Sequence, residues 1–261
     1  MADAAHETLL RYALEGPVAV IGLDRPAKRN AISDPLLAAL DAAVARAQGE
    51  ARCIVLHGHG PCFSAGLDLS GHVARGAPEV FHHSRGWHAV FRRLRMGPVP
   101  AIAAIHGACI GGGLELAAAC HIRVADETAF FALPEGTRGI FVGGGASVHV
   151  ARLIGAARMA EMMLTGRALS AEEAERAGLV THVRPPGEAL ARAMELAGKV
   201  AQTAPLTVLG VLQALPRIQD MSEEDGLFVE SLIAALAQTG PEAQAGLAAF
   251  LEKRAPKTGA G

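Results

Sequence analysis

Short apolar runs that alternate with helical segments are the feature that most constrains the fold of this chain. The runs CIVLHG (53–58), AIAAIHG (101–107) and HIRVAD (121–126) each have the length of one buried strand, and segments of helical pattern lie between them. Strands that are joined by helices pair in parallel, because the crossover returns the chain to the same edge. The order therefore predicts an α/β fold with a largely parallel sheet.

The flanking segments extend this prediction. Residues 8–15 and 17–23 are expected to form a hairpin, and AFFAL (129–133) is expected to form a further strand. Ser33, followed by an acid and a proline, predicts a helix that runs to Gln48, and residues 79–96 and 113–120 are also predicted to be helical. Ser170 and Glu173 form a capping box that opens a helix to Gly178, and LVTHV (179–183) is the last expected strand.

Every segment after Pro185-Pro186 has a helical pattern that proline and glycine interrupt. We therefore expect two parts, a catalytic core over 1–195 and a C-terminal helical region over 196–261.

Composition narrows the classes of function. The 261 residues carry a formal charge of −2, so the chain has no general attraction for nucleic acid or for an anionic membrane. No basic and apolar leader opens the chain, and no apolar run approaches the length of about 18 residues that a spanning helix needs. The four cysteines lack a CxxC spacing, which is typical of free thiols in a reducing compartment, and the expected location is the cytoplasm.

The histidines and arginines raise the question of two further kinds of partner, a metal ion and nucleic acid. His57 with His59, and His82 with His83, do not fit a zinc signature, so no metal site is predicted. The segment SRGWHAVFRRLRMG (84–97) is rich in arginine, which is most simply explained as the solvated basic face of a helix. A nucleic-acid-binding or scaffold role is kept as a remote alternative.

Two glycine-containing loops follow predicted strands, FSAGLDL (63–69) and IGGGLEL (110–116). Such turns leave backbone N–H groups unpaired, so two of them together could place two donors on one oxygen and form an oxyanion hole. Each loop alone is also compatible with a simple change of chain direction. Neither loop fits the phosphate-binding patterns GxxxxGK[ST] or GxGxxG.

Two carboxylates stand beside glycine-rich loops. Glu115 lies in a first helical turn between apolar neighbours, and Glu135 follows an apolar strand and a proline. Each acid alone has an ordinary explanation, as a helix-terminus charge or as a solvated loop residue. Together they are suited to general acid–base chemistry at one site.

The chain resembles the crotonase superfamily of enoyl-CoA hydratases and isomerases over nearly its whole length. The matching segments are LDRPAKRNAI (23–32), FSAGLDL, PAIAAIHGACIGGGLELAAACHIRVADETAFFALPEG (100–136), GGGAS (143–147), LTGRALSAEEAERAGLV (164–180) and FLEKR (250–254). The resemblance implies a spiral of ββα units followed by helices that build a homotrimer or a hexamer. It also implies an acyl-CoA thioester as substrate, with coenzyme A as part of that substrate and with no separate cofactor.

The resemblance assigns roles to individual residues. The N–H groups of Leu67 and Gly112 would hold the thioester oxygen. Glu115 would act as base toward a water molecule, Glu135 would deliver a proton to the α carbon, and the N–H of Gly143 would help to hold the water. The residues expected to line coenzyme A are Ala27, Lys28, Arg29, Ala65, Asp68, Leu69, Phe250 and Lys253.

The expected reaction is the addition of water across the 2,3 double bond of an enoyl-CoA thioester. Isomerisation between the Δ3 and Δ2 positions, or other acyl-CoA chemistry on the same fold, is the alternative, because the resemblance allows isomerisation with the Glu135-type acid alone. Arg138 and Phe141 depart from the family pattern near the acyl site and leave the acyl group open.

Overall fold

A computed structural model describes residues 9–70 and 75–252 of the chain. The described chain divides between Ala201 and Gln202 into two compact units, an α/β unit and a helical unit. The boundary expected after residue 195 falls inside helix α7 (Ala189–Val200), and the division lies just beyond that helix because its alanines pack on the sheet of the first unit.

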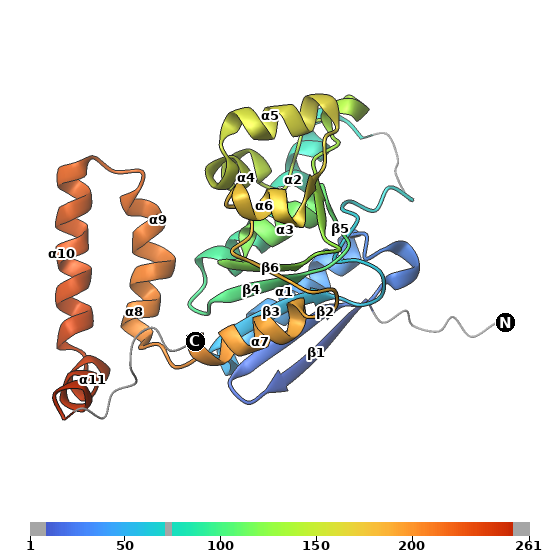
Figure 1. The fold of residues 1–261 in the computed structure, drawn as a ribbon. Coiled ribbons are helices and arrows are strands. Elements are labelled where there is room, and N and C mark those ends of the chain that lie inside the picture. The colour runs from blue at the N-terminus through green and yellow to red at the C-terminus, as the bar shows by residue number, and fades with distance from the viewer. Residues whose placement is uncertain (1–8, 71–74, 253–261) are drawn as a thin grey trace. The chain divides into compact units, whose positions relative to one another are not determined.

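A six-stranded sheet forms the centre of the first unit (Figure 1). Its order is β1-β2-β3-β4-β6-β9, where β1 is Leu10–Glu15, β2 Val18–Leu23, β3 Cys53–Gly58, β4 Ala101–Ile105, β6 Ile122–Asp126 and β9 His182–Arg184. The β1–β2 hairpin is antiparallel and all other pairs are parallel, which confirms the predicted α/β architecture.

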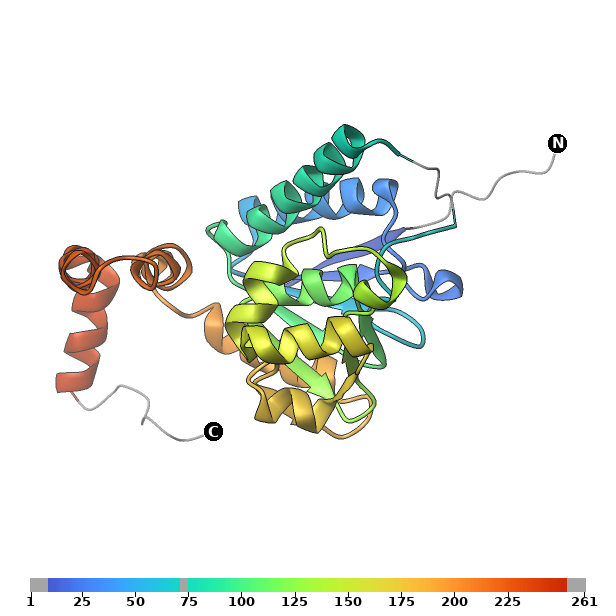
Figure 2. The same ribbon diagram turned by 90° about the horizontal axis from the view of Figure 1, so that it is seen from above.

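The two faces of this sheet bury different partners. Alternate residues such as Val20, Val55 and Ala104 face α7, whose alanines allow the helix to approach closely. The other face packs against α1 (Asp34–Glu50), α2 (Ala77–Met96) and α3 (Gly112–Ala119) in the main core. Figure 2 shows α2 running alongside α1 above the sheet.

A smaller sheet, β5-β7-β8, stands next to the main one. It comprises β5 (Ala108–Ile110), β7 (Phe130–Ala132) and β8 (Leu169–Ser170). The helices that follow are α4 (Ala146–Ile154), α5 (Ala156–Thr165) and α6 (Ala171–Arg176), and short 3₁₀ turns span Pro26–Lys28 and Gly136–Arg138. Strand β5 was not predicted, because its three residues follow a turn and their pairing partner lies 22 residues further on.

The predicted helix caps are confirmed. The Ser33 hydroxyl accepts a hydrogen bond from the Leu36 amide, and Ser170 exchanges both bonds of the capping box with Glu173. The expected strand over 179–183 is wrong in its position. The amides of Leu179 and Val180 bond to the Ala174 carbonyl and end α6, so the strand begins only at His182.

The second unit is helical, as the sequence predicts for this region. It comprises α8 (Pro205–Leu209), a π-helical turn (Gly210–Ala214), α9 (Leu215–Ile218), α10 (Glu223–Thr239) and α11 (Pro241–Leu251). The π-helical turn precedes Pro216, which has no N–H to continue an α-helical ladder. No helix in residues 9–70 or 75–252 is long and apolar enough to cross a membrane.

Candidate active site

The loop after β3 is held between two other segments of the chain. On one side, the Ile32 amide donates to the Gly66 carbonyl at 2.7 Å, and the Asp68 amide donates to the Ile32 carbonyl at 3.0 Å. On the other side, the Ser64 amide donates to Ala108, and the Ile110 amide donates to Ser64. The first glycine loop is therefore fixed against the start of the second.

These contacts bring the amides of Leu67 and Gly112 close together. A Cβ atom built on Gly66 would lie 3.2 Å from the Gly112 nitrogen, and one built on Gly112 would lie 3.4 Å from the Leu67 nitrogen. Gly66 has a φ of +93°, a conformation that favours glycine. Gly112 is the first residue of α3, where backbone N–H groups have no partner within the helix. Two such donors side by side have the form of an oxyanion hole.

An aromatic side chain of α2 closes one side of this amide pair. Trp87 is 4% exposed, and a Cβ on Gly112 would meet its Cζ3 atom at 2.7 Å. The Trp87 ring packs edge-on against Phe91 with 5.5 Å between ring centroids. A Cβ built on Gly144 would lie 3.1 Å from Phe91 Cε2 and 2.6 Å from Glu115 Oε2, so Phe91 also borders the Glu115 carboxylate. Helix α2 therefore provides an apolar wall from the amide pair to Glu115.

Glu115 is buried, and its carboxylate is hydrogen-bonded to backbone amides. Its Oε1 atom accepts hydrogen bonds from the Gly144 amide at 2.8 Å and from the Ala146 amide at 3.0 Å, at the start of α4. Burial raises the pKa of Glu115, and these backbone donors lower it and offset part of that rise. The amide donors favour the ionised form of the carboxylate, which is the form that can accept a proton.

Glu135 has fewer hydrogen-bond donors around its carboxyl group than Glu115. Its Oε2 atom is buried and has no hydrogen-bond partner among the residues that the structure describes. Its Oε1 atom lies 2.6 Å from where a Cβ of Gly111 would stand, so the carboxyl group lies directly against the second glycine loop. Burial raises the pKa of Glu135, its own backbone amide and the charge of Arg138 lower it, and the charge of Glu115 raises it. This group is suited to hold a proton and to deliver it.

The structure therefore brings the two predicted carboxylates and the two predicted amides to the N-terminal end of α3. Gly143 belongs to the same place, because it precedes the amides that bind Glu115. Its carbonyl accepts a 2.6 Å hydrogen bond from the Ser84 hydroxyl of α2.

The expected coenzyme A residues of the first unit also lie together. The Ala65 amide donates to the Arg29 carbonyl at 2.9 Å, so the loop of Ala27, Lys28 and Arg29 lies beside the loop of Ala65, Asp68 and Leu69. Phe250 belongs to the second unit, on α11, and its side chain is exposed. Lys253 lies outside the described residues.

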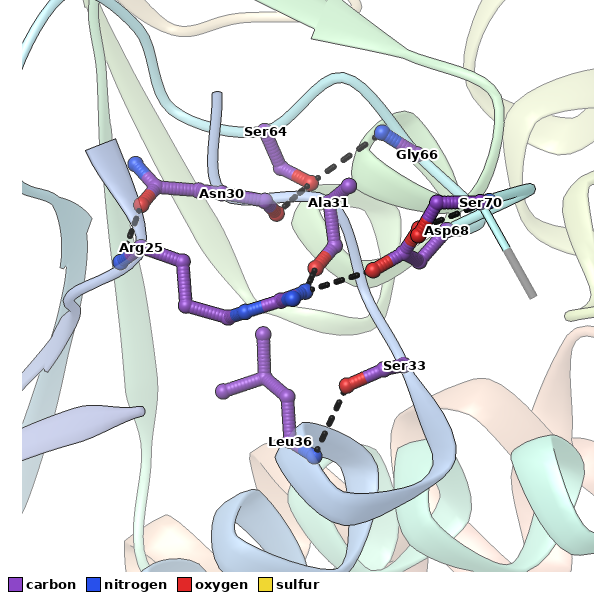
Figure 3. Close-up of polar contacts among 9 residues, drawn as sticks. All are labelled: Arg25, Asn30, Ala31, Ser33, Leu36, Ser64, Gly66, Asp68 and Ser70. Carbon is purple, nitrogen blue, oxygen red and sulfur yellow. Dashed lines mark hydrogen bonds and ion pairs between the residues drawn. The ribbon is translucent and has the colours of Figure 1, made fainter. Parts of the chain in front are cut away.

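Sequence reasoning missed the groups that hold these loops. Asn30 is fully buried with a φ of +55°, and it bridges Arg25 to the carbonyls of His59 and Cys62. Figure 3 shows the contact between Arg25 and Asn30. The segment RPAKRN itself offers a signal, since asparagine tolerates the left-handed conformation better than most residues. The approach of Trp87 to Gly112 and of Ser84 to Gly143, by contrast, joins residues far apart in the chain and leaves no local signal.

No metal centre accompanies these groups in the described part of the chain. No cluster of three or more His, Cys, Asp or Glu side chains there is arranged to hold a metal ion. The four cysteines are all free and buried.

Comparison with known proteins adds an independent line of argument. Residues 14–260 match the family model described as enoyl-CoA hydratase/isomerase. The 2,3-dehydroadipyl-CoA hydratase of Escherichia coli strain K12 is 34% identical over 241 residues, which cover 92% of this chain and 94% of that protein.

Solved structures show the same likeness in three dimensions. The structure of an enoyl-CoA hydratase homologue from Rhodopseudomonas palustris CGA009 is 51% identical, with a TM-score of 0.92 over 97% of this chain and 98% of its own. The enoyl-CoA hydratase of Bacillus anthracis is 32% identical, with a TM-score of 0.88 over 95% and 98% of the two chains. The fold is therefore the one that the sequence resemblance implied.

Proposed function

Because the chain belongs to the enoyl-CoA hydratase/isomerase family, we propose that it adds water across the 2,3 double bond of an enoyl-CoA thioester. The observation that carries this proposal is the presence of two differently supported carboxylates, Glu115 and Glu135, beside one pair of backbone donors. A hydratase needs a base for the water and an acid for the α carbon, and the two environments supply one of each.

In the proposed mechanism, the thioester oxygen lies between the N–H groups of Leu67 and Gly112. Negative charge develops on this oxygen as water attacks the β carbon, and fixed donors stabilise it without reorganisation. Glu115 takes a proton from the attacking water while the new C–O bond forms, and Glu135 gives its proton to the α carbon. The apolar wall of Trp87 and Phe91 keeps bulk water away from both steps.

Coenzyme A is part of the proposed substrate. The exposed residues of the turn Ala27 to Arg29 and of the loop Ala65 to Leu69 are proposed to line it, since these two segments lie side by side.

The test is hydration of crotonyl-CoA by the purified protein and by Glu115→Gln and Glu135→Gln variants. Each substitution is expected to lower kcat by roughly 10²–10⁴, the usual contribution of general acid–base catalysis, while the fold stays intact. Near-wild-type turnover by either folded variant contradicts the two-carboxylate mechanism. Isomerised 3-hexenoyl-CoA without hydrated product, measured in heavy water, assigns the protein to the isomerases.

A homotrimer or a hexamer is the assembly that we propose for this activity. Helices α10 and α11 expose apolar side chains that a partner can cover, among them Leu227, Phe228, Leu232, Leu236, Leu247 and Phe250. Sedimentation equilibrium measures the mass, and a monomer at micromolar concentration contradicts this part of the proposal.

A further inference from the structure

A partly buried ion pair involves Asp68, the residue that follows Leu67. Arg25 Nη1 and Asp68 Oδ2 are 2.8 Å apart, and the two side chains are 8% and 10% exposed (Figure 3). The other Asp68 oxygen accepts hydrogen bonds from the Ser70 amide at 3.0 Å and from the Ser70 hydroxyl at 2.6 Å. These partners lower the pKa of Asp68 to about 2, so the carboxylate is charged at any working pH.

Arg25 ties this carboxylate to a second segment of the chain. The same Nη1 atom donates to the Ala31 carbonyl at 2.7 Å, one residue before the Ile32 bridge to the glycine loop. The Arg25 amide donates to Asn30 Oδ1, and the Asn30 carbonyl accepts from the Ser64 hydroxyl. The network therefore joins the turn of residues 25–31 to the loop of residues 64–70 through buried polar atoms.

Leu67 is the residue that this network encloses. Before it, Gly66 is fixed through its carbonyl to Ile32 and through its amide to the Ser64 hydroxyl at 3.2 Å. After it, Asp68 is fixed through its amide and through its carboxylate. The Leu67 side chain is 40% exposed, so its own packing fixes the backbone only weakly. The direction of the Leu67 N–H is set by its two neighbours.

We propose that Arg25 and Asp68 are positioning residues, whose ion pair aims the Leu67 N–H at the thioester oxygen of the substrate. This inference rests on the proposed function, in which that N–H is one of the two oxyanion donors. It also gives Asp68 a different task from direct contact with coenzyme A. All of the Asp68 contacts above are internal, and a carboxylate is a poor neighbour for the phosphates of coenzyme A.

The two tasks predict different kinetics. A residue that aims an oxyanion donor acts on the transition state, so its loss lowers kcat and leaves KM nearly unchanged. A residue that holds coenzyme A acts on both states, so its loss raises KM. An enoyl-CoA whose double bond is conjugated with an aromatic ring adds a readout that does not depend on kcat, because polarisation of its carbonyl by the oxyanion donors moves the absorption band of the bound molecule to longer wavelength.

The experiment compares Asp68→Asn with wild type by steady-state kinetics, by the band shift of the bound chromophore and by thermal melting. Asp68→Asn is expected to lower kcat roughly tenfold, to change KM less than about twofold and to reduce the band shift. The effect is smaller than removal of a donor, because an N–H that points partly away from the oxyanion still contributes part of its stabilisation. Asp41→Asn is the matched control. It breaks the 2.6 Å pair with Arg93 between α1 and α2, and it is expected to change neither kcat nor the band shift.

A second variant keeps the test valid if Asp68→Asn does not fold. Arg25→Met with Asp68→Leu removes both charges of this pair, a kind of replacement that ion pairs shielded from solvent often tolerate. This folded variant is expected to show the same reduced kcat and band shift. A wild-type kcat and band shift in it overturns the proposal, and so does a raised KM with unchanged kcat in Asp68→Asn. A wild-type protein that shifts the chromophore band but does not hydrate crotonyl-CoA contradicts the proposed reaction and leaves the positioning role standing.

Discussion

Adding one methyl group at Gly112 tests the second member of the amide pair, the Gly112 N–H. A Cβ at this position would lie 2.7 Å from Trp87 Cζ3 and 2.9 Å from Cη2, whereas carbon atoms in ordinary contact are about 3.5–4.0 Å apart. Either the indole ring retreats by about 1 Å, or the Gly112 backbone moves away from it. The ring is 4% exposed and packs on Phe91, so it has little room to retreat.

We therefore expect Gly112→Ala to lower both stability and turnover. Overpacking of this kind costs about 1–3 kcal/mol of unfolding free energy. A displacement of about 1 Å at an oxyanion donor lowers kcat by up to roughly 10²-fold. Urea unfolding measures the first quantity, and initial rates with saturating crotonyl-CoA measure the second.

Trp87→Phe supplies the decisive comparison. It removes the indole edge that the new methyl group would meet, so Gly112→Ala combined with Trp87→Phe is expected to recover most of the kcat of Trp87→Phe alone. Gly198→Ala on α7 is the control, since its Cβ would meet no atom within 4 Å. That control is expected to keep wild-type kcat and to gain up to about 1 kcal/mol of stability. A wild-type kcat for Gly112→Ala, or a loss that Trp87→Phe leaves unchanged, refutes the steric reasoning.

Two further predictions concern a loop contact and a buried histidine. Ser84→Ala removes the hydrogen bond to the Gly143 carbonyl and is expected to lower kcat several-fold through the loop that binds Glu115, whereas Ser84→Thr keeps the hydroxyl and is expected to restore it. His121 accepts the Ala101 amide on one ring nitrogen and contacts the Arg95 carbonyl with the other, and burial lowers its pKa to about 4. The unfolded chain therefore binds a proton more readily than the folded one between pH 6.5 and about 4, and stability falls as the pH falls through this range. His121→Gln is expected to reduce the stability difference between pH 7 and pH 5 by about 2 kcal/mol in urea unfolding.

Features carried by neighbouring residues were predictable from the sequence. The β1–β2 hairpin, the three central parallel strands and the caps at Ser33 and Ser170 each depend on a local pattern, and the structure has them all. The beginning of β9 was not predictable in this way. Leu179 and Val180 have the composition of a strand, yet their amides are used to end α6, and composition does not report where a backbone hydrogen bond goes.

The same distinction between local patterns and long-range contacts applies to the candidate site. Glu115 and Glu135 stand out in the sequence because each interrupts an apolar segment, and the glycine loops stand out by composition. Their partners do not stand out. The Gly144 and Ala146 amides bind a carboxylate about 30 residues earlier in the chain, and Asp68 meets Arg25 across 43 residues. These pairings arise only when the fold brings distant loops together, so the sequence alone indicates the two carboxylates and does not indicate the groups that support them.

The coupling of the two carboxylates yields a prediction about pH whose sign follows from their contacts. The charge of Glu115 raises the pKa of Glu135, so Glu115→Gln removes that charge and lowers the pKa of Glu135. In the proposed mechanism, exchange of the α proton of a saturated acyl-CoA thioester with heavy water uses Glu135 without an attacking water, so it is expected to remain measurable in this variant. The pH at which exchange changes between its acid and alkaline limits is expected to move to lower pH in Glu115→Gln. Because interacting groups titrate as a pair, the comparison is between whole profiles of variant and wild type. A profile that stays in place or moves to higher pH means that Glu115 does not act on Glu135 through its charge, and the division of roles between base and acid then loses its electrostatic basis.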